Sequence, residues 1–127
     1  MAEQRSLKGV RVFVVEDETL LALLLEDMLV DMGCEVLDMA WRLAQAIKVA
    51  ETSEADVAIL DVNIAGERVD PVADILEKRK IPFVFATGYG VAGLPDRLRG
   101  HPVLPKPVSA TQLATALGKV LNGASGP

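Results

Sequence analysis

The amino-acid sequence predicts an α/β fold, with a doubly wound, five-stranded parallel sheet and helices on both faces. Five short runs rich in β-branched residues begin about 21 to 25 residues apart, which is the length of one strand plus one helix. The segments between these runs repeat apolar residues at helical spacing, and this alternation is typical of parallel βαβ units. We expect the 127 residues to form a single domain, 1–127, with its core over about 9–122 and a short flexible C-terminal tail.

The expected strands follow one another through the whole chain, so that five strand–helix units fill it. They are Val10–Val15, Glu35–Ala40, Val57–Leu60, Ile81–Ala86 and a brief Pro102–Leu104.

The first helix is expected to contain six consecutive apolar residues, Leu20–Leu25. At about 100° per residue, these side chains go more than once around the helix and cannot all face the sheet. Some of the leucines are therefore either covered by the last helix or exposed as a docking patch for a partner. The sequence leaves both alternatives open.

The second and third helices have clear sequence patterns. A helix from about Arg42 to Glu51 has its apolar residues on one stripe. In the third helix, we expect Asp70 to be the N-cap and Pro71 to lie in the first turn. This helix ends at the cationic residues 78–80, which suit the negative end of the helix dipole.

The last two helices differ in how well they are specified. A fourth helix between Val91 and Leu98 is expected to be short or mobile, because two glycines and a proline interrupt the pattern. The fifth helix begins with a capping box formed by Ser109 and Gln112 and stops at Gly123.

Composition excludes several classes of function. A net charge of −5 and an aromatic content of 4% argue against a nucleic-acid surface, which needs basic residues and stacking rings. The longest apolar run is far shorter than the ~20 residues that cross a bilayer, so no membrane segment is expected. A single cysteine, Cys34, and an N-terminus without a secretory pattern predict a cytoplasmic protein without an internal disulfide.

Polar residues follow four of the five expected strands. In an open parallel sheet, ligands bind at the carboxyl ends of the strands, so these residues are expected to share one rim. They are Glu16 and Asp17 after the first strand, Asp61 after the third, Thr87 and Gly88 after the fourth, and Lys106 after the fifth.

Three carboxylates on one rim predict a bound cation. They would repel one another unless a positive group lay among them, and Mg²⁺ binds through carboxylates, carbonyls and water. Asp61 could then act as a nucleophile toward phosphorus. Phosphoryl transfer needs positioned positive groups and donors, which Mg²⁺, Lys106, the Thr87 hydroxyl and the Gly88 N–H would supply.

The order of these motifs resembles the receiver domain of two-component response regulators (CheY-like). The resemblance covers essentially the whole chain and rests on five motifs at matching strand ends: the pair Glu16 and Asp17, then Asp61, Thr87 and Lys106-Pro107. It implies a stand-alone receiver with a flavodoxin-like (βα)5 fold, and the strand order 2-1-3-4-5 is taken from that family.

The resemblance also implies a site and a reaction. Asp61 would accept a phosphoryl group from the phosphohistidine of a sensor histidine kinase or a phosphotransfer protein, with Mg²⁺ held by Glu16, Asp17, Asp61 and the backbone carbonyl of Asn63. Lys106 would contact the phosphoryl oxygens. The Lys106–Pro107 bond would be cis. Such a protein signals through a downstream protein target and is not an enzyme, apart from slow self-dephosphorylation.

Other residues depart from the common receiver pattern. Val103 stands where many receivers have an aromatic switch residue, and Phe85-Ala86-Thr87-Gly88 resembles the branch nicknamed FAT GUY, which lacks that ring. Tyr89, displaced by one position from the tyrosine of that branch, is a candidate replacement for the switch.

Two other functions remain as alternatives. A dehalogenase-like phosphohydrolase combines similar residues, but its nucleophile would follow the first strand. A receiver-fold interaction module that works without phosphorylation would be expected to lack part of the acceptor set, which is intact here. Among the remaining residues, His101 is expected to be a solvated loop residue, and Cys34 and Trp41 are expected to serve packing.

Overall fold

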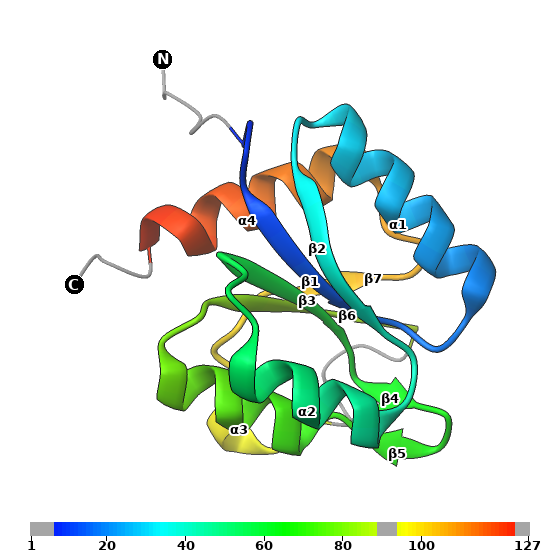
Figure 1. The fold of residues 1–127 in the computed structure, drawn as a ribbon, viewed down its shortest axis with the longest axis vertical. Helices are drawn as coiled ribbons and strands as arrows, with labels where there is room; N and C mark the ends of the chain where they lie inside the picture. Colours follow the sequence, from blue (N-terminus) through cyan, green and yellow to red (C-terminus); the bar gives the residue numbers. More distant parts are fainter. Residues whose placement is uncertain (1–6, 89–93, 124–127) are drawn as a thin grey trace.

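The computed structural model describes residues 7–88 and 94–123. Its main sheet has five parallel strands in the order β2-β1-β3-β6-β7 (Figure 1). Two further strands, β4 and β5, pair only with each other, so the main sheet has the predicted order 2-1-3-4-5. The five strands of this sheet are β1 (Arg11–Val15), β2 (Glu35–Ala40), β3 (Val57–Asp61), β6 (Phe83–Thr87) and β7 (Val103–Pro105).

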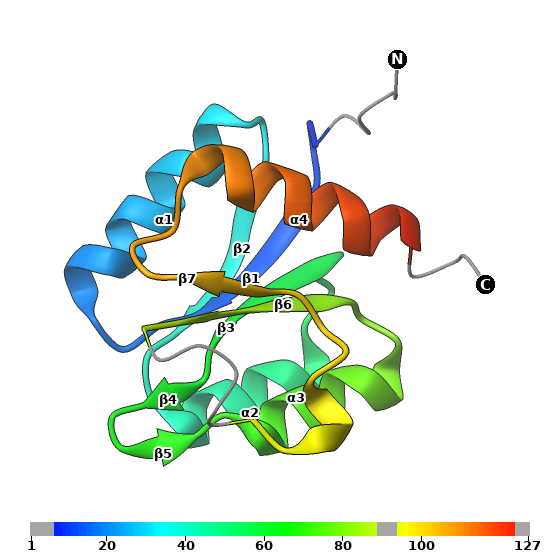
Figure 2. The ribbon, with the colours of Figure 1, turned by 180° about the vertical axis from the view of Figure 1, so that it is seen from behind.

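Helices cover both faces of the sheet. Helices α1 (Thr19–Asp31) and α4 (Ala110–Gly123) lie on one face, and α2 (Leu43–Thr52) and α3 (Asp70–Arg79) lie on the other (Figures 1 and 2). This arrangement confirms the doubly wound prediction. No helix in the described part of the chain is long and apolar enough to cross a membrane.

Alternate residues of the central strands supply the two halves of the core. Val12 and Val14 of β1 pack in the cluster under α1 and α4, whereas Phe13 and Val15 pack in the cluster under α2 and α3. All residues of β3 and β6 are buried, because a parallel sheet covered by helices has no solvent face. The polar residues at the strand ends therefore stand on a rigid base.

Helix α1 resolves the question of the consecutive leucines. Leu25 packs into the core, while Leu20, Leu23 and Leu24 are 70%, 50% and 44% exposed. The last helix therefore does not cover these three leucines, and that alternative is wrong for them. They leave an apolar strip on α1.

The start of α3 differs from the prediction. Val69 occupies the N-cap position without a side-chain cap, and Asp70 is already the first helical residue. The Asp70 carboxylate instead accepts a hydrogen bond from the Arg68 guanidinium at 3.1 Å, which draws it away from the helix N–H groups. The cationic end of the helix is confirmed by Lys78 and Arg79 in its last turn.

A 3₁₀ turn, η2 (Asp96–Leu98), occupies part of the expected fourth helix. Leu94 and Leu98 are buried in the core beside α3. The rest of that expected helix, 91–93, lies outside the described residues, as does the C-terminal tail, 124–127. The short fourth element therefore rests on α3 through buried leucines.

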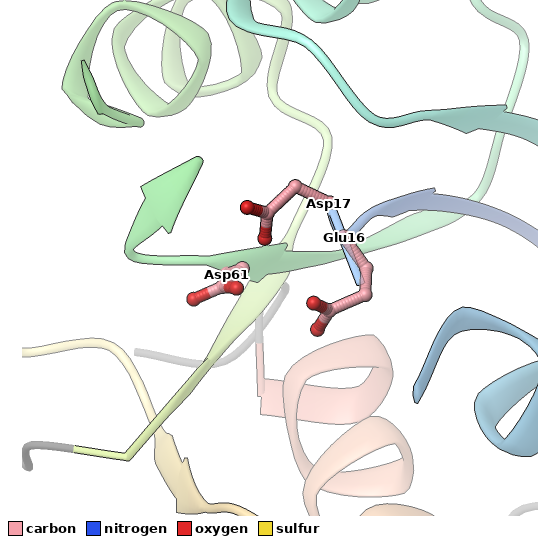
Figure 3. Close-up of side chains that lie close together, drawn as sticks. All are labelled: Glu16, Asp17 and Asp61. Carbon is pink, nitrogen blue, oxygen red and sulfur yellow. The ribbon is translucent and has the colours of Figure 1, made fainter. Parts of the chain in front are cut away.

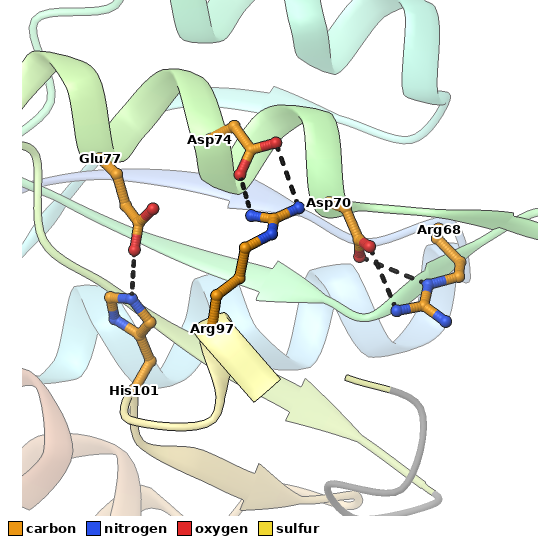
Figure 4. Close-up of polar contacts among 6 residues, drawn as sticks. All are labelled: Arg68, Asp70, Asp74, Glu77, Arg97 and His101. Carbon is orange, nitrogen blue, oxygen red and sulfur yellow. Dashed lines mark hydrogen bonds and ion pairs between the residues drawn. The ribbon is translucent and has the colours of Figure 1, made fainter. Parts of the chain in front are cut away.

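Polar contacts along one edge of α3 accompany this packing (Figure 4). Asp74 pairs with Arg97 of η2, and Glu77 Oε2 lies 2.8 Å from His101 Nε2. His101 also stacks on Phe83, with ring centroids 4.1 Å apart. The expectation that His101 is simply solvated is wrong, because the ring has both a stacking partner and a carboxylate partner.

The N-terminus of α4 has the predicted cap. The Gln112 N–H donates to Ser109 Oγ at 3.1 Å, which satisfies one of the free donors of the first turn. This cap defines the start of α4, shortly after Lys106.

The β4–β5 hairpin was not predicted. Strands β4 (Asn63–Ile64) and β5 (Glu67–Arg68) are antiparallel and are joined by Ala65 and Gly66. Both turn residues have positive φ, 51° and 86°, as a type I′ turn requires. The hairpin follows β3 directly and therefore stands beside Asp61.

Candidate functional site

Three acidic side chains converge at the carboxyl ends of β1 and β3 (Figure 3). Glu16 and Asp17 follow β1, and Asp61 is the last residue of β3. Each side chain offers a carboxylate oxygen, and these oxygens all lie within 4.8 Å of one another. The rim predicted from the sequence therefore brings all three carboxylates together.

Lys106 joins two of these carboxylates. Its Nζ lies 2.8 Å from Glu16 Oε1 and 2.7 Å from Asp61 Oδ2. The Lys106 N–H also donates to the Thr87 carbonyl at 3.1 Å, which ties the loop after β7 to the end of β6. The Lys106–Pro107 peptide bond is cis, as predicted.

Burial makes the Glu16–Lys106 contact electrostatically important. Glu16 is 1% exposed, and its burial raises the pKa of the carboxyl although Lys106 opposes the change. Burial lowers the pKa of Lys106, but hydrogen bonds to Asp61 and Glu16 outweigh that effect and raise it. The ammonium group is therefore held charged among the acids.

Glu16 also has a local structural role. Its Oε2 accepts a hydrogen bond from the N–H of Glu18 at 3.1 Å, and Glu18 is the N-cap residue of α1. Glu16 therefore contacts the start of α1 with one carboxylate oxygen and Lys106 with the other.

The hairpin orients the backbone after Asp61. Ile64 pairs with Glu67, and the Val69 N–H donates to the Val62 carbonyl at 3.0 Å, so Asn63 occupies the non-hydrogen-bonded position between them. Its N–H is oriented to donate to Asp61 Oδ1 at 3.3 Å. In an extended strand, the carbonyl of the same residue lies on the same edge, which makes it available to the site.

Thr87, Gly88 and Lys106 line one open cleft with Asp17 and Asp61, of about 690 Å³. Thr87 is buried, whereas a side chain added at Gly88 would meet open space. The cleft thus gathers the residues that the sequence assigned to phosphoryl chemistry. Tyr89, the candidate switch residue, lies outside the described residues.

The residues of this rim fit a divalent cation. Three carboxylates and one ammonium group leave two negative charges when all are ionised, and Mg²⁺ would balance them. Carboxylate and carbonyl oxygens are also the ligands that Mg²⁺ prefers. Glu16, Asp17, Asp61 and the Asn63 carbonyl could supply them.

Cys34 and Trp41, which do not belong to the rim, were both expected to serve packing. Cys34 is buried, as expected for a packing residue. Trp41 is 48% exposed, so the expectation that it serves packing is wrong, although Ala40 immediately before it is fully buried.

No family model matches the chain, but individual relatives do. The transcriptional regulatory protein PdtaR of Mycobacterium tuberculosis is 32% identical over 111 residues, which are 84% of this chain and 54% of the relative. The chain thus spans about half the length of the curated relatives it matches.

Two solved structures match over nearly their full length. SdrG from Sphingomonas melonis Fr1 is 40% identical, with a TM-score of 0.80, and the match covers 89% of this chain and 97% of SdrG. The signal receiver domain of a modulated diguanylate cyclase from Desulfovibrio desulfuricans G20 is 25% identical, with a TM-score of 0.81, and the match covers 92% and 97%.

Proposed function

The chain belongs to the receiver domains of response regulators, of the FAT GUY type, and on that basis we propose that it accepts a phosphoryl group on Asp61 with Mg²⁺ bound beside it. The observation that carries this proposal is the contact of Asp61 Oδ2 with Lys106 Nζ at 2.7 Å, within a cluster of acids. The Lys106 ammonium holds the Asp61 carboxylate in one orientation at the end of β3. The open cleft leaves room for a phosphorylated donor to reach this carboxylate.

The proposed step is the transfer of a phosphoryl group from a nitrogen or oxygen leaving group to a carboxylate. A carboxylate oxygen of Asp61 attacks the donor phosphorus as the P–N or P–O bond of the donor breaks, and the electron pair of that bond stays on the leaving group. The leaving group is the imidazole of the donor's histidine side chain, which takes up one proton from solvent, or acetate when acetyl phosphate is the donor. Bound Mg²⁺ would offset the negative charge of the acids and of the phosphoryl oxygens.

The chain's own residues prepare this step. Lys106 already contacts Asp61, so its ammonium is in place as charge moves onto the phosphoryl oxygens. The Thr87 hydroxyl and the Gly88 N–H belong to the same cleft and are the proposed donors to those oxygens.

The proposed partners are proteins. A sensor histidine kinase or phosphotransfer protein would supply the phosphoryl group, and a downstream protein target would read the phosphorylated state, in the cytoplasm. The acidic net charge of −5 supports protein partners over nucleic acid.

Incubation with acetyl phosphate and Mg²⁺, followed by intact mass measurement, tests the proposed function. We expect the wild type to gain the mass of one phosphoryl group only when the divalent cation is present. Asp61→Asn should abolish the gain. Asp70→Asn is a matched control, because Asp70 pairs with Arg68 outside the cleft, and it should be labelled like the wild type.

A wild type that never gains the mass would contradict the phosphoryl-acceptor proposal and favour a module that binds partners without phosphorylation. Labelling that persists in Asp61→Asn would assign the acceptor to another residue.

A further inference from the structure

The hairpin after β3 contacts the acidic cluster through its turn. The N–H of Ala65 donates to Asp17 Oδ2 at 2.9 Å, across 48 positions of sequence. Glu16 and Asp61 are held by Lys106 at 2.8 Å and 2.7 Å. The hairpin thus supplies a hydrogen-bond donor to Asp17, as Lys106 does to Glu16 and Asp61.

The conformation of the turn explains why this N–H points at Asp17. The strands pair up to Ile64 and Glu67, so the two turn residues stand outside the strand pairing and the Ala65 N–H does not join it. Ala65 has a φ of 51° and Gly66 a φ of 86°. Positive φ is rare for alanine and ordinary for glycine, so Gly66 is the residue that allows the turn to form.

The hydrogen bond from Ala65 to Asp17 counteracts repulsion among the acidic side chains. Asp17 is half-buried and lies within 4.8 Å of two other acidic side chains, which repel it when all three are ionised. An Asp17 side chain without a partner would rotate toward solvent. A donor from the backbone opposes that rotation, and one of the two carboxylate oxygens remains available for a cation.

From these observations, and resting on the proposed function, we propose that the Ala65–Gly66 turn is a positioning element that holds Asp17 in its metal-binding orientation and thereby sets the affinity of the site for Mg²⁺. Partners that orient metal ligands typically change metal affinity by about 10- to 100-fold when they are lost. Because the Asp17 side chain is held in place before the cation binds, binding does not have to restrict its rotation.

Gly66→Val tests the proposal through the backbone alone. A Cβ at Gly66 meets no atom within 4 Å, so the substitution acts by disfavouring the positive φ and not by a clash. We expect the dissociation constant for Mg²⁺, measured by isothermal titration calorimetry without a phosphoryl donor, to rise about tenfold. Gly66→Asn places a side chain of similar size there but tolerates positive φ, and it should retain most of the affinity.

Gly9→Val is the matched control for loss of stability. Gly9 also has a positive φ, 80°, and an open Cβ position, but it lies before β1, at the opposite end of that strand from Asp17. We expect it to lower the melting temperature as Gly66→Val does, without changing the Mg²⁺ affinity.

The outcomes separate the two proposals. Wild-type affinity in Gly66→Val, or an equal loss in Gly66→Asn or Gly9→Val, overturns the positioning role and leaves the phosphoryl-acceptor proposal standing. A wild type that binds no Mg²⁺ overturns both.

Discussion

Replacing Lys106 with methionine removes the cation that lies between two buried carboxylates. The Lys106 side chain is 14% exposed, and the side chains of Glu16 and Asp61 are 1% and 9% exposed. Breaking a buried ion pair by removing one partner typically costs about 3–5 kcal/mol, because the remaining charge stays buried. We expect the lower end, about 3 kcal/mol, because Glu16 can take up a proton and so relieve part of the penalty.

Urea unfolding, followed by circular dichroism in Mg²⁺-free buffer at pH 7, measures this loss. Burial raises the pKa of Glu16 in the folded protein, so its protonated form favours folding at low pH and this contribution is lost as the pH rises through the folded pKa. Without Lys106 the pKa of Glu16 should rise further. The destabilisation by Lys106→Met should therefore be smaller at pH 5 than at pH 7, and excess Mg²⁺ should restore part of the stability at pH 7.

Two further variants decide whether the buried charge is the cause. Lys119→Met makes the same change on the exposed side of α4 and should alter the free energy of unfolding by no more than about 0.5 kcal/mol. Adding Glu16→Gln to Lys106→Met removes one of the uncompensated charges and should recover part of the loss. Equal stability of Lys106→Met and the wild type, with no effect of pH or Mg²⁺, would refute the electrostatic reasoning.

Two other predictions concern the exposed strip and the buried thiol. Leu20→Glu changes a leucine that is 70% exposed, so we expect phosphoryl transfer from a phosphorylated donor protein to slow while labelling by acetyl phosphate is unchanged; equal rates from the protein donor would exclude docking at this leucine. Burial raises the pKa of the Cys34 thiol, so alkylation by iodoacetamide at pH 8 should be slow in the folded protein and fast in urea. The free energy of unfolding should also fall at alkaline pH, because the thiol of the unfolded chain ionises at a lower pH than the buried thiol. Equal alkylation rates in native buffer and in urea would contradict the burial of the thiol.

The sequence pattern predicted the five strands of the main sheet to within two residues, and it predicted the ends of the second, third and last helices closely. Apolar runs and capping residues act locally, so Glu35–Ala40 and the Ser109 cap could be read directly. The strand Ile81–Ala86 begins later, at Phe83, because Pro82 has no N–H to donate to β3. The β4–β5 hairpin was missed although Gly66 is a turn residue, because two-residue strands are too short to show alternation.

The candidate site divides in the same way. Because the carboxyl ends of parallel strands share one rim, the positions of the polar residues after the expected strands predicted that Glu16, Asp17, Asp61 and Lys106 would lie together, and they do. Which acid each cation or N–H contacts depends on side chains from distant segments. Only the tertiary structure decided that Lys106 holds Glu16 and Asp61 while the Ala65 N–H holds Asp17. These contacts join segments that lie far apart in the sequence, so local patterns do not predict them, and repulsion among the three acids makes the choice of partner matter.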